Sequence, residues 1–394
     1  MQEQFQFSDR AKKICYGLMG AGLLGLLIGI LFHYDTPDRI WANLLLNNYY
    51  FMGISLIGIF FVAVHTIGFG GWYTIFKRVT ESMGAFLPIA GVIMLVITAG
   101  AFFHWHGIYH WSHPGVAKHD PIIAGKMPYF QPVFFIGRIV AYFLLWIGLS
   151  WMIRKLSLQE SDEGEGLNQY KKSKVYSALF LIVFAVTEST ISWDLIMSID
   201  THWYSTLFGW YNFSSYFVGG IAFLILIVIY LKKSGYLQPA NDSHIHDLGK
   251  FMFAFSVFWA YLWFSQYMLI WYGNIPEETV YYKERFANFS FLFWFNFVVN
   301  FMVPFLVLMT RKAKRRMNLL IVVSFILLFG HWLDYYLMIM PGAVGEAAGI
   351  GLTEILVAVG FFGAFAFTTL NALTKVPLLA TNNPFFKESL QHHT

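Results

Sequence analysis

The sequence predicts an all-α membrane protein, a single integral domain over residues 1–394 with ten transmembrane helices. Composition carries this prediction: 57% of the 394 residues are apolar or aromatic, only 12% are charged, and the mean hydropathy is +0.56. A soluble domain carries about 25% charged residues. A soluble fold of this length cannot bury so much apolar surface, and disorder requires low hydrophobicity with high charge. Both of those classes are therefore excluded.

Ten stretches of the chain reach the roughly 20 apolar residues that a helix needs to cross a bilayer. Prolines, charges and polar clusters fall between them. In chain order, the predicted helices are Ile14–His33, Tyr50–Phe76, Gly84–Phe103, Val133–Ile153, Val175–Met197, Ser214–Leu231, Lys250–Tyr272, Asn288–Met309, Leu319–Met340 and Ile350–Leu373. The second to fifth and the sixth to ninth can be drawn as two four-helix bundles flanked by the first and last helices, although no residue-level repeat supports that division.

Small residues and prolines mark special positions in these helices. In the first helix, Ala21, Gly25 and Gly29 are spaced by four and form a stripe that allows close helix approach. The stripe serves either internal packing or a contact with another subunit. Pro88 and Pro304 lie inside the third and eighth predicted helices, where we expect kinks. No small-residue cleavage site follows the first helix, so we expect that helix to remain in the mature protein.

Positive charge alternates strongly between the connections. Of the 26 lysines and arginines, 20 fall at the termini and in the even-numbered connections, five fall in the odd-numbered connections, and Arg138 lies inside the fourth helix. Lys77 and Arg78 are counted with the second connection. Because cytoplasmic loops carry the excess of Lys and Arg, this pattern predicts that both termini are cytoplasmic. We interpret the basic clusters as topology determinants rather than as sites for lipid headgroups or nucleic acid.

The residues that ligate metals and cofactors are few. Cys15 is the only cysteine, which excludes a disulfide framework, cysteine-ligated iron–sulfur clusters and CxxCH haem attachment. The third connection is rich in histidine, with His104, His106, His110, His113 and His119. No cysteine or carboxylate completes a familiar ligand spacing there, so we expect contacts with a partner or the bilayer surface rather than a metal site. A haem b would need His65 and His331 as axial ligands at matched depth, and nucleotide-binding fingerprints are absent from the sequence. We expect no cofactor bound by this chain alone.

Ionisable side chains at membrane depth are costly, and each one is a functional hypothesis. His65 is placed midway along the second predicted helix, and Glu188 is central in the fifth. The candidates for a proton path are His65, Arg138, Glu188, Asp194, His331, Asp334 and Glu354. Buried carboxylates and imidazoles suit proton uptake and release. The alternative is a structural network, for instance an ion pair between Arg138 and Asp194.

Two stretches resemble a known family. They are Ser192–Tyr211 (SWDLIMSIDTHWYSTLFGWY) and Phe255–Thr279 (FSVFWAYLWFSQYMLIWYGNIPEET). Both look like the F subunit of bacterial alternative complex III, a quinol:cytochrome c oxidoreductase whose membrane subunits belong to the NrfD-like (polysulfide reductase membrane subunit) superfamily. Chain length, ten helices and cytoplasmic termini are similar as well. The resemblance implies two four-helix bundles with one helix on each side, in the bacterial inner membrane.

The resemblance also implies partners and site residues. The partners would be a sister NrfD-like subunit, multihaem cytochrome c subunits and an iron–sulfur subunit, which hold the c-type haems and iron–sulfur clusters, with a terminal oxidase as a further partner. Quinone would contact Glu188, Trp193 and Asp194. Residues expected at the outer surface, where they would dock a partner, are Asp200, His202, Tyr204, Asn274 and Glu277.

The sequence therefore predicts an integral membrane subunit of a quinol:electron-acceptor oxidoreductase in a respiratory chain. The chain would act as a scaffold and offer a proton path, without being catalytic alone. The alternative is a secondary transporter with a mid-membrane acidic site. A transporter of that kind predicts discontinuous helices with Gly or Pro breaks at matching places in two halves, and Pro88 and Pro304 are not flanked by such breaks in the sequence.

Overall fold

The computed structural model describes residues 4–32, 36–160 and 166–393, and these residues are almost entirely helical. Ten of its helical segments are long and apolar enough to cross a membrane. Their main helices are α1 (Asp9–Phe32), α2 (Asp38–Ile67), α4 (Leu87–Phe102), α7 (Pro132–Gln159), α8 (Gly166–Leu195), α9 (Phe208–Lys233), α10 (Asp242–Gly273), α11 (Pro276–Phe297), α13 (Met317–Val344) and α14 (Leu352–Leu373). The prediction of an all-α, ten-helix membrane protein is confirmed.

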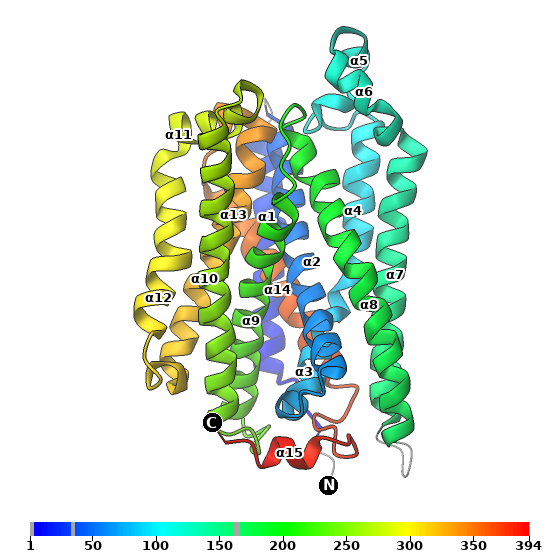
Figure 1. The fold of residues 1–394 in the computed structure, drawn as a ribbon, viewed down its shortest axis with the longest axis vertical. Helices are drawn as coiled ribbons and strands as arrows, with labels where there is room; N and C mark the ends of the chain where they lie inside the picture. The colour runs from blue at the N-terminus through cyan, green and yellow to red at the C-terminus, as the bar shows by residue number, and fades with distance from the viewer. Residues whose placement is uncertain (1–3, 33–35, 161–165, 394) are drawn as a thin grey trace.

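Both chain termini lie at the same end of the bundle, as an even number of spans requires (Figure 1). We call this the terminal end. The short helices α5 (Val116–His119) and α6 (Pro121–Phe130) project beyond the opposite end, which we call the loop end. The positive-inside prediction assigns the terminal end to the cytoplasm.

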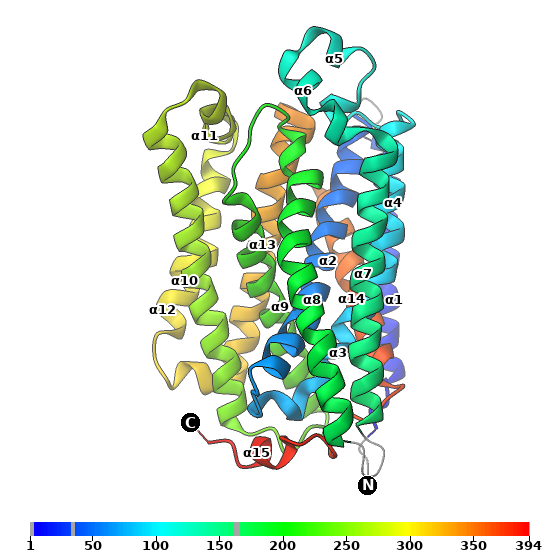
Figure 2. The same ribbon diagram turned by 45° about the vertical axis from the view of Figure 1, so that its right-hand side comes forward.

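The chain after α14 crosses the terminal end and contains the short helix α15 (Phe386–Leu390), as Figure 2 shows. Asn383 donates to the Glu160 carboxylate at the end of α7 (2.9 Å), and the His392 ring lies 2.7 Å from Asp247 on α10. This C-terminal segment therefore links helices on opposite sides of the bundle.

At the centre of the molecule, α2 and α9 have almost no surface left for lipid. α2 packs against α4, α8, α9, α13 and α14, and α9 packs against α2, α8, α10 and α13. Because α9 contacts helices from both predicted halves, the division into two four-helix bundles stays a prediction.

The second helix is displaced from its predicted range, since α2 begins at Asp38 rather than Tyr50 and ends at Ile67 rather than Phe76. Its first turns are polar, but these side chains find partners inside the bundle. Asn47 accepts from the Trp332 indole (2.9 Å), and Asn48 donates to the carbonyl of Ala90 (2.9 Å). Hydropathy averaged over neighbouring residues does not detect such partners, because they lie on other helices.

The third span begins earlier than predicted and is broken into short pieces before α4: η1 (Trp72–Phe76), α3 (Lys77–Ser82) and η2 (Met83–Phe86). Lys77 and Arg78 were expected in an exposed connection, but both are buried in α3. The Lys77 ammonium pairs with the Glu160 carboxylate at 2.8 Å, and Arg78 donates to the carbonyl of Ser157 at 2.6 Å. Both basic residues therefore bond to other groups inside the protein rather than serving as loop charges.

Neither proline kinks a continuous helix. Pro88 occupies the first turn of α4, directly after η2, and Pro304 occupies the first turn of α12 (Val303–Leu308). A π-helical segment, η5 (Val298–Met302), precedes α12. The missing N–H of proline is tolerated in a first turn, so both residues mark places where a helix restarts. The eighth span also begins at Pro276 rather than Asn288.

The glycine-rich face of α1 packs on α14. A Cβ on Gly22 would lie 2.5 Å from the Cα of Gly360, and a Cβ on Gly25 would lie 2.6 Å from the Cβ of Leu356. These contacts let the two backbones approach closely, as small residues do in membrane helix pairs. The glycine stripe therefore serves internal packing. The rest of α1 faces outward, with large apolar side chains such as Leu31 exposed.

Replacing Gly22 by leucine should separate α1 from α14, because no space exists for the new side chain. We expect a loss of about 1–3 kcal/mol in unfolding free energy of the detergent-solubilised chain. Gly17→Leu is the matched control, since no atom lies within 4 Å of a Cβ at that position. Equal stability of the two variants would contradict close packing at Gly22.

Candidate functional site

Asp334 lies near the middle of α13 and is 1% exposed. Its carboxylate accepts four hydrogen bonds from three other helices. The donors are the hydroxyl of Tyr211 and the hydroxyl of Ser215 (2.8 Å) on α9, the indole of Trp259 (2.8 Å) on α10 and the amide of Asn296 (2.8 Å) on α11. One carboxylate thus holds α9, α10, α11 and α13 together.

Helical spacing explains why these donors converge. Tyr211 and Ser215 are four residues apart on α9 and share one face. Asn296 lies two residues before the π-helical segment η5, and Asn300 within η5 donates to the Asn296 side chain at 2.7 Å. A π-helical turn re-aims the side chains around it and recurs at functional sites. Here the Asn296 amide reaches Asp334, and the Asn300 amide bonds to Asn296 behind it.

The donor set indicates the charge state of Asp334. The N–H groups of Trp259 and Asn296 can only donate and so favour the carboxylate ion, whereas the hydroxyls of Tyr211 and Ser215 can donate to the ion or accept from the acid. Among the described residues, no lysine or arginine lies within ion-pair distance of Asp334. A carboxylate held in the bundle core by hydrogen bonds alone is the kind of intramembrane group that marks a functional site.

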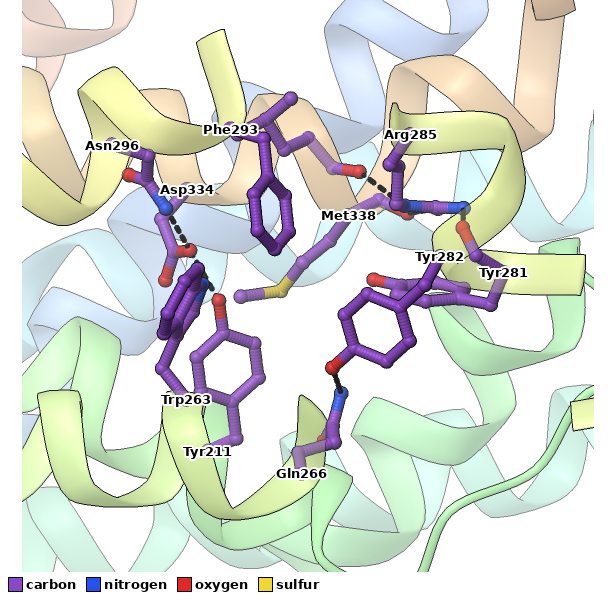
Figure 3. Close-up of a pocket in the computed structure, with 11 residues that line it drawn as sticks. Tyr211, Trp263, Gln266, Tyr281, Tyr282, Arg285, Phe293, Asn296, Asp334 and Met338 are labelled. Atoms are coloured by element: carbon purple, nitrogen blue, oxygen red, sulfur yellow. Dashed lines mark hydrogen bonds between the residues drawn. The ribbon is translucent and has the colours of Figure 1, made fainter. Parts of the chain in front are cut away.

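A small cavity of about 20 Å³ adjoins Asp334 on the side of the loop end, enough for about one water molecule. Figure 3 shows Tyr211, Asn296 and Asp334 at one side of this space and Tyr282 and Gln266 at the other. Polar and aromatic side chains form most of its wall. The remaining lining residues are Trp263, Tyr281, Arg285, Phe293, Leu337 and Met338.

Arg285 connects the cavity to the loop end. Its guanidinium donates to Asp200 (3.1 Å) and to the carbonyls of Leu337 (3.0 Å) and Tyr281 (2.9 Å), and it lies 3.4 Å from the centre of the Tyr281 ring. Arg285 itself is 1% exposed, whereas the Asp200 side chain is 17% exposed. Asp200 is therefore the point at which this polar system reaches the surface.

Polar side chains continue from Asp334 toward the terminal end. His331 shares Ser215 with Asp334: its ring lies 3.0 Å from that hydroxyl, which itself donates to the carboxylate. Four buried polar atoms on this side have no hydrogen-bond partner in the described part of the chain: His331 Nε2, Asn300 Oδ1, Ser256 Oγ and Ser324 Oγ. Buried polar atoms without partners are usually satisfied by internal water.

Glu188 forms a second acidic centre, in α8. It is 5% exposed, the Ser189 hydroxyl donates to it at 3.2 Å, and the Tyr216 hydroxyl on α9 lies beside its carboxylate. The ion pairs of the described residues do not include it. Trp193 is partly buried, and its indole N–H lacks a partner in the same residue ranges. Quinone contact at Glu188, Trp193 and Asp194 stays a prediction.

Asp194 and Arg138 form a bidentate ion pair. The guanidinium of Arg138 on α7 donates to both carboxylate oxygens, at 3.2 and 3.0 Å, and stacks on the Tyr129 ring at 3.7 Å. The two side chains are 11% and 0% exposed. This is the pairing that the structural alternative predicts.

Glu354 is also paired, near the loop end. Arg39 donates to both of its carboxylate oxygens (2.8 and 2.9 Å), and Asn43 adds a third donor at 3.0 Å. Glu354 lies in the first turn of α14 and also accepts from the N–H of Gly351 at 2.8 Å. Its carboxylate oxygens therefore link α14 to α2 through hydrogen bonds.

His65 does not lie at mid-membrane. It occupies the last turn of α2 near the terminal end, where its Nδ1 lies 2.8 Å from the carbonyl of Phe61 and its ring contacts Tyr73. The displaced range of α2 explains the difference. Because His331 is central in α13, the two histidines are at different depths and cannot serve as a pair of haem ligands.

The loop end carries the remaining candidates. His202 is exposed and lies 2.5 Å from Asp120, which also caps α6. The N–H of Ile123 and the His202 ring hold the pKa of Asp120 below its usual value. Tyr204, Asn274 and Glu277 are exposed as expected. Their role in docking stays a prediction.

The five histidines of the third connection do not assemble into a metal site in the structure. His106 turns inward, where it lies 2.8 Å from the carbonyl of Ile97, and burial lowers its pKa. His110 and His113 have ring centres 5.8 Å apart. Within the described residues, no group of three or more His, Cys, Asp or Glu side chains could hold a metal ion.

Sequence reasoning missed the donors to Asp334 and the buried charges at the terminal end. Asn296 and Asn300 are spaced by four within an apolar stretch, and that spacing is the signal that could have revealed them. Glu81, 2% exposed on α3, lies near Lys77 and Arg78. Glu160 could not have been found, because its partners come from distant parts of the sequence.

Neither a scan against models of known protein families nor a search of curated proteins finds a match for this chain. The site is therefore interpreted from its own geometry.

Breaking the Arg138–Asp194 pair should destabilise the protein, because each single change leaves one charge buried without its partner. We expect Asp194→Asn to cost about 3–5 kcal/mol in unfolding free energy of the purified chain. Replacing both residues, as Arg138→Met with Asp194→Leu, should recover most of that loss. Ser192→Ala is the control on the same helix, since this hydroxyl donates only to the carbonyl of Ser189. A stable Asp194→Asn variant would contradict a structural pair.

Proposed function

We propose that this chain is a membrane subunit of a quinol:electron-acceptor oxidoreductase in which Asp334 carries protons within the bundle. The observation that carries the proposal is the buried Asp334 carboxylate, which accepts hydrogen bonds from three other helices. Among the described residues it has no ion-pair partner. A purely structural carboxylate at this depth would be expected to have a cation beside it, as Asp194 has.

The two stretches that resemble the alternative complex III subunit support this proposal by their position. Ser192–Tyr211 supplies Tyr211 and Asp200, and Phe255–Thr279 supplies Trp259 and Gln266. Tyr211 and Trp259 donate to Asp334, and Gln266 lines the cavity beside it. The segments that carry the resemblance thus meet around one acidic centre.

The arrangement suits stepwise proton transfer. From the loop end, a proton would pass from the surface near Asp200 through the cavity to the Asp334 carboxylate. Tyr211 and Ser215 can reverse their hydroxyl bonds when Asp334 is protonated, since a hydroxyl both donates and accepts. Toward the terminal end, the His331 imidazole can accept the outgoing proton at Nε2, and the Asn300 side-chain oxygen can accept a hydrogen bond from an internal water. Each step moves one proton between neighbouring groups and leaves the net charge of the bundle unchanged after a full passage.

Within the complex, electron carriers would belong to the partner subunits. These are the multihaem cytochrome c and iron–sulfur subunits at the loop end, a sister NrfD-like subunit in the membrane, and a terminal oxidase as the final acceptor. Quinol oxidation would release protons near this chain, in the bacterial inner membrane with both termini cytoplasmic.

A secondary transporter is the second candidate, and the local departure from α-helical geometry at η5 favours it. A discontinuous helix beside a mid-membrane acidic group is a feature of transporter sites. Asn296, one of the four donors to Asp334, lies two residues before η5. Uptake of a solute into liposomes that contain this chain alone would favour the transporter over the redox subunit.

Purification from native membranes should separate the two functions. We expect subunits with covalently bound haem and with iron–sulfur clusters to co-purify with this chain, detected by their absorbance and electron paramagnetic resonance spectra. A stable, active chain that purifies without redox partners would contradict the proposal.

Asp334→Asn should lower proton-coupled turnover of the intact complex by roughly tenfold or more, because the amide cannot take up a proton. Asp334→Glu should restore part of the activity. Asp242→Asn, the same chemical change at an exposed carboxylate in the first turn of α10, is the matched control. Normal proton release with assembled Asp334→Asn complex would reduce this residue to a structural role.

A further inference from the structure

An apolar groove lies on the lipid-facing side of the protein near the terminal end. It has a volume of about 330 Å³, opens to the side, and is formed by the last residue of α2 and the first half of α8. Its lining residues are Ile67, Lys174, Val175, Ala178, Leu179 and Ile182. The only charged group in this lining is the Lys174 ammonium.

The groove continues into an exposed apolar stripe along α8. Val175, Leu179 and Ile182 are 58%, 46% and 67% exposed, and Val186 extends the same face at 64%. Their spacing of four, three and four residues keeps them on one side of the helix. Between Lys174 and Ile182 the helix rises roughly 12 Å, so the stripe leads from the end of the bundle well into the hydrocarbon region.

Positive charge gathers at the edge of the groove that is nearest the terminal end. Lys171 and Lys174 are three residues apart and share the face that bears the stripe, and Lys172 is adjacent. No carboxylate of the described residues pairs with any of these three lysines. By contrast, Lys77 and Lys250 each pair with a carboxylate, at 2.8 and 2.7 Å.

Phe69 completes the rim from the connection after α2. Its ring is 55% exposed, and the Lys174 ammonium lies 4.7 Å from the ring centre. Phe69 has a left-handed backbone with a φ of 53°, which is costly for a bulky residue and recurs at ligand-binding sites. The exposed Phe69 ring therefore places an apolar surface beside the Lys174 ammonium at the rim of this groove.

The sequence predicted only a topological role for these lysines, but from this geometry we propose that the groove binds an anionic glycerophospholipid from the leaflet at the terminal end. The phosphate would lie between Lys171 and Lys174, and one acyl chain would follow Val175, Leu179 and Ile182. The occupant must carry a negative group and a hydrocarbon chain in this order, because the cationic rim and the apolar stripe follow each other on one helix face. Basic pockets between membrane helices bind anionic headgroups in this way.

The test uses the full-length chain, delipidated in detergent and titrated with phosphatidylglycerol or with phosphatidylcholine of identical acyl chains. Native mass spectrometry counts the lipids that remain bound. We expect preferential retention of phosphatidylglycerol, and Lys174→Gln should weaken that retention about fivefold, the contribution of one lysine near an anionic lipid. Ala178→Phe should fill the groove and lower the retention of both lipids.

The matched control is Lys155→Gln. Lys155 lies near the end of α7 at the same end of the bundle and also contacts an exposed aromatic ring, that of Trp151, at 5.1 Å, but it lines no part of this groove. Retention of phosphatidylglycerol should be unchanged in this variant. An equal loss in Lys155→Gln and Lys174→Gln would overturn the proposal, since it would show diffuse charge attraction.

Two further outcomes would also overturn it. One is equal binding of both lipids by the unmodified chain. The other is a partner protein that crosslinks into the groove of the intact complex through a photoreactive group at Leu179. Ala178→Leu replaces Ala178→Phe if the larger side chain prevents folding, as judged by thermal unfolding. Because no redox or proton measurement enters, this test is independent of the function proposed for Asp334.

Discussion

The structure depends on one constraint: a polar group inside a membrane bundle must find its partner within the protein or its internal water, because hydrocarbon offers none. Asp334, Asp194 and Glu354 meet this constraint in different ways. Asp194 and Glu354 each pair with an arginine from another helix, whereas Asp334 collects four neutral donors. The difference matters for function, since an ion pair fixes charge while a ring of neutral donors permits protonation.

The same constraint organises the helix packing. Asn47 hydrogen-bonds α2 to α13, and Asn48 hydrogen-bonds α2 to α4. Glu354 does the same between α14 and α2. At the terminal end, Glu160 gathers Lys77 from α3 and Asn383 from the C-terminal segment. Apolar surface alone would leave the rotation of each helix undetermined, because lipid and leucine are equally apolar. Buried polar contacts therefore select the arrangement.

Composition and hydropathy were enough to predict the number and type of helices, because these depend on local sequence. Boundaries failed wherever a polar segment is buried, as in the first turns of α2 and in α3. For the site, the sequence could name Asp334 and His331, since both interrupt an apolar run. It could not name Tyr211, Trp259 or Asn296 as their partners, because such contacts join residues 38 to 123 positions apart. The pair of Arg138 with Asp194 was foreseeable because only one arginine was predicted at membrane depth.

The π-helical segment η5 carries a consequence for how this protein can change over evolution. A π turn holds one residue more than an α turn, so losing a single residue there would yield a regular helix without breaking the span. That loss would rotate everything before it by about 100° relative to α12 and turn Asn296 away from Asp334. Substitutions in this region can accumulate gradually, but a change in chain length between Phe297 and Val303 would alter the acidic centre in one step.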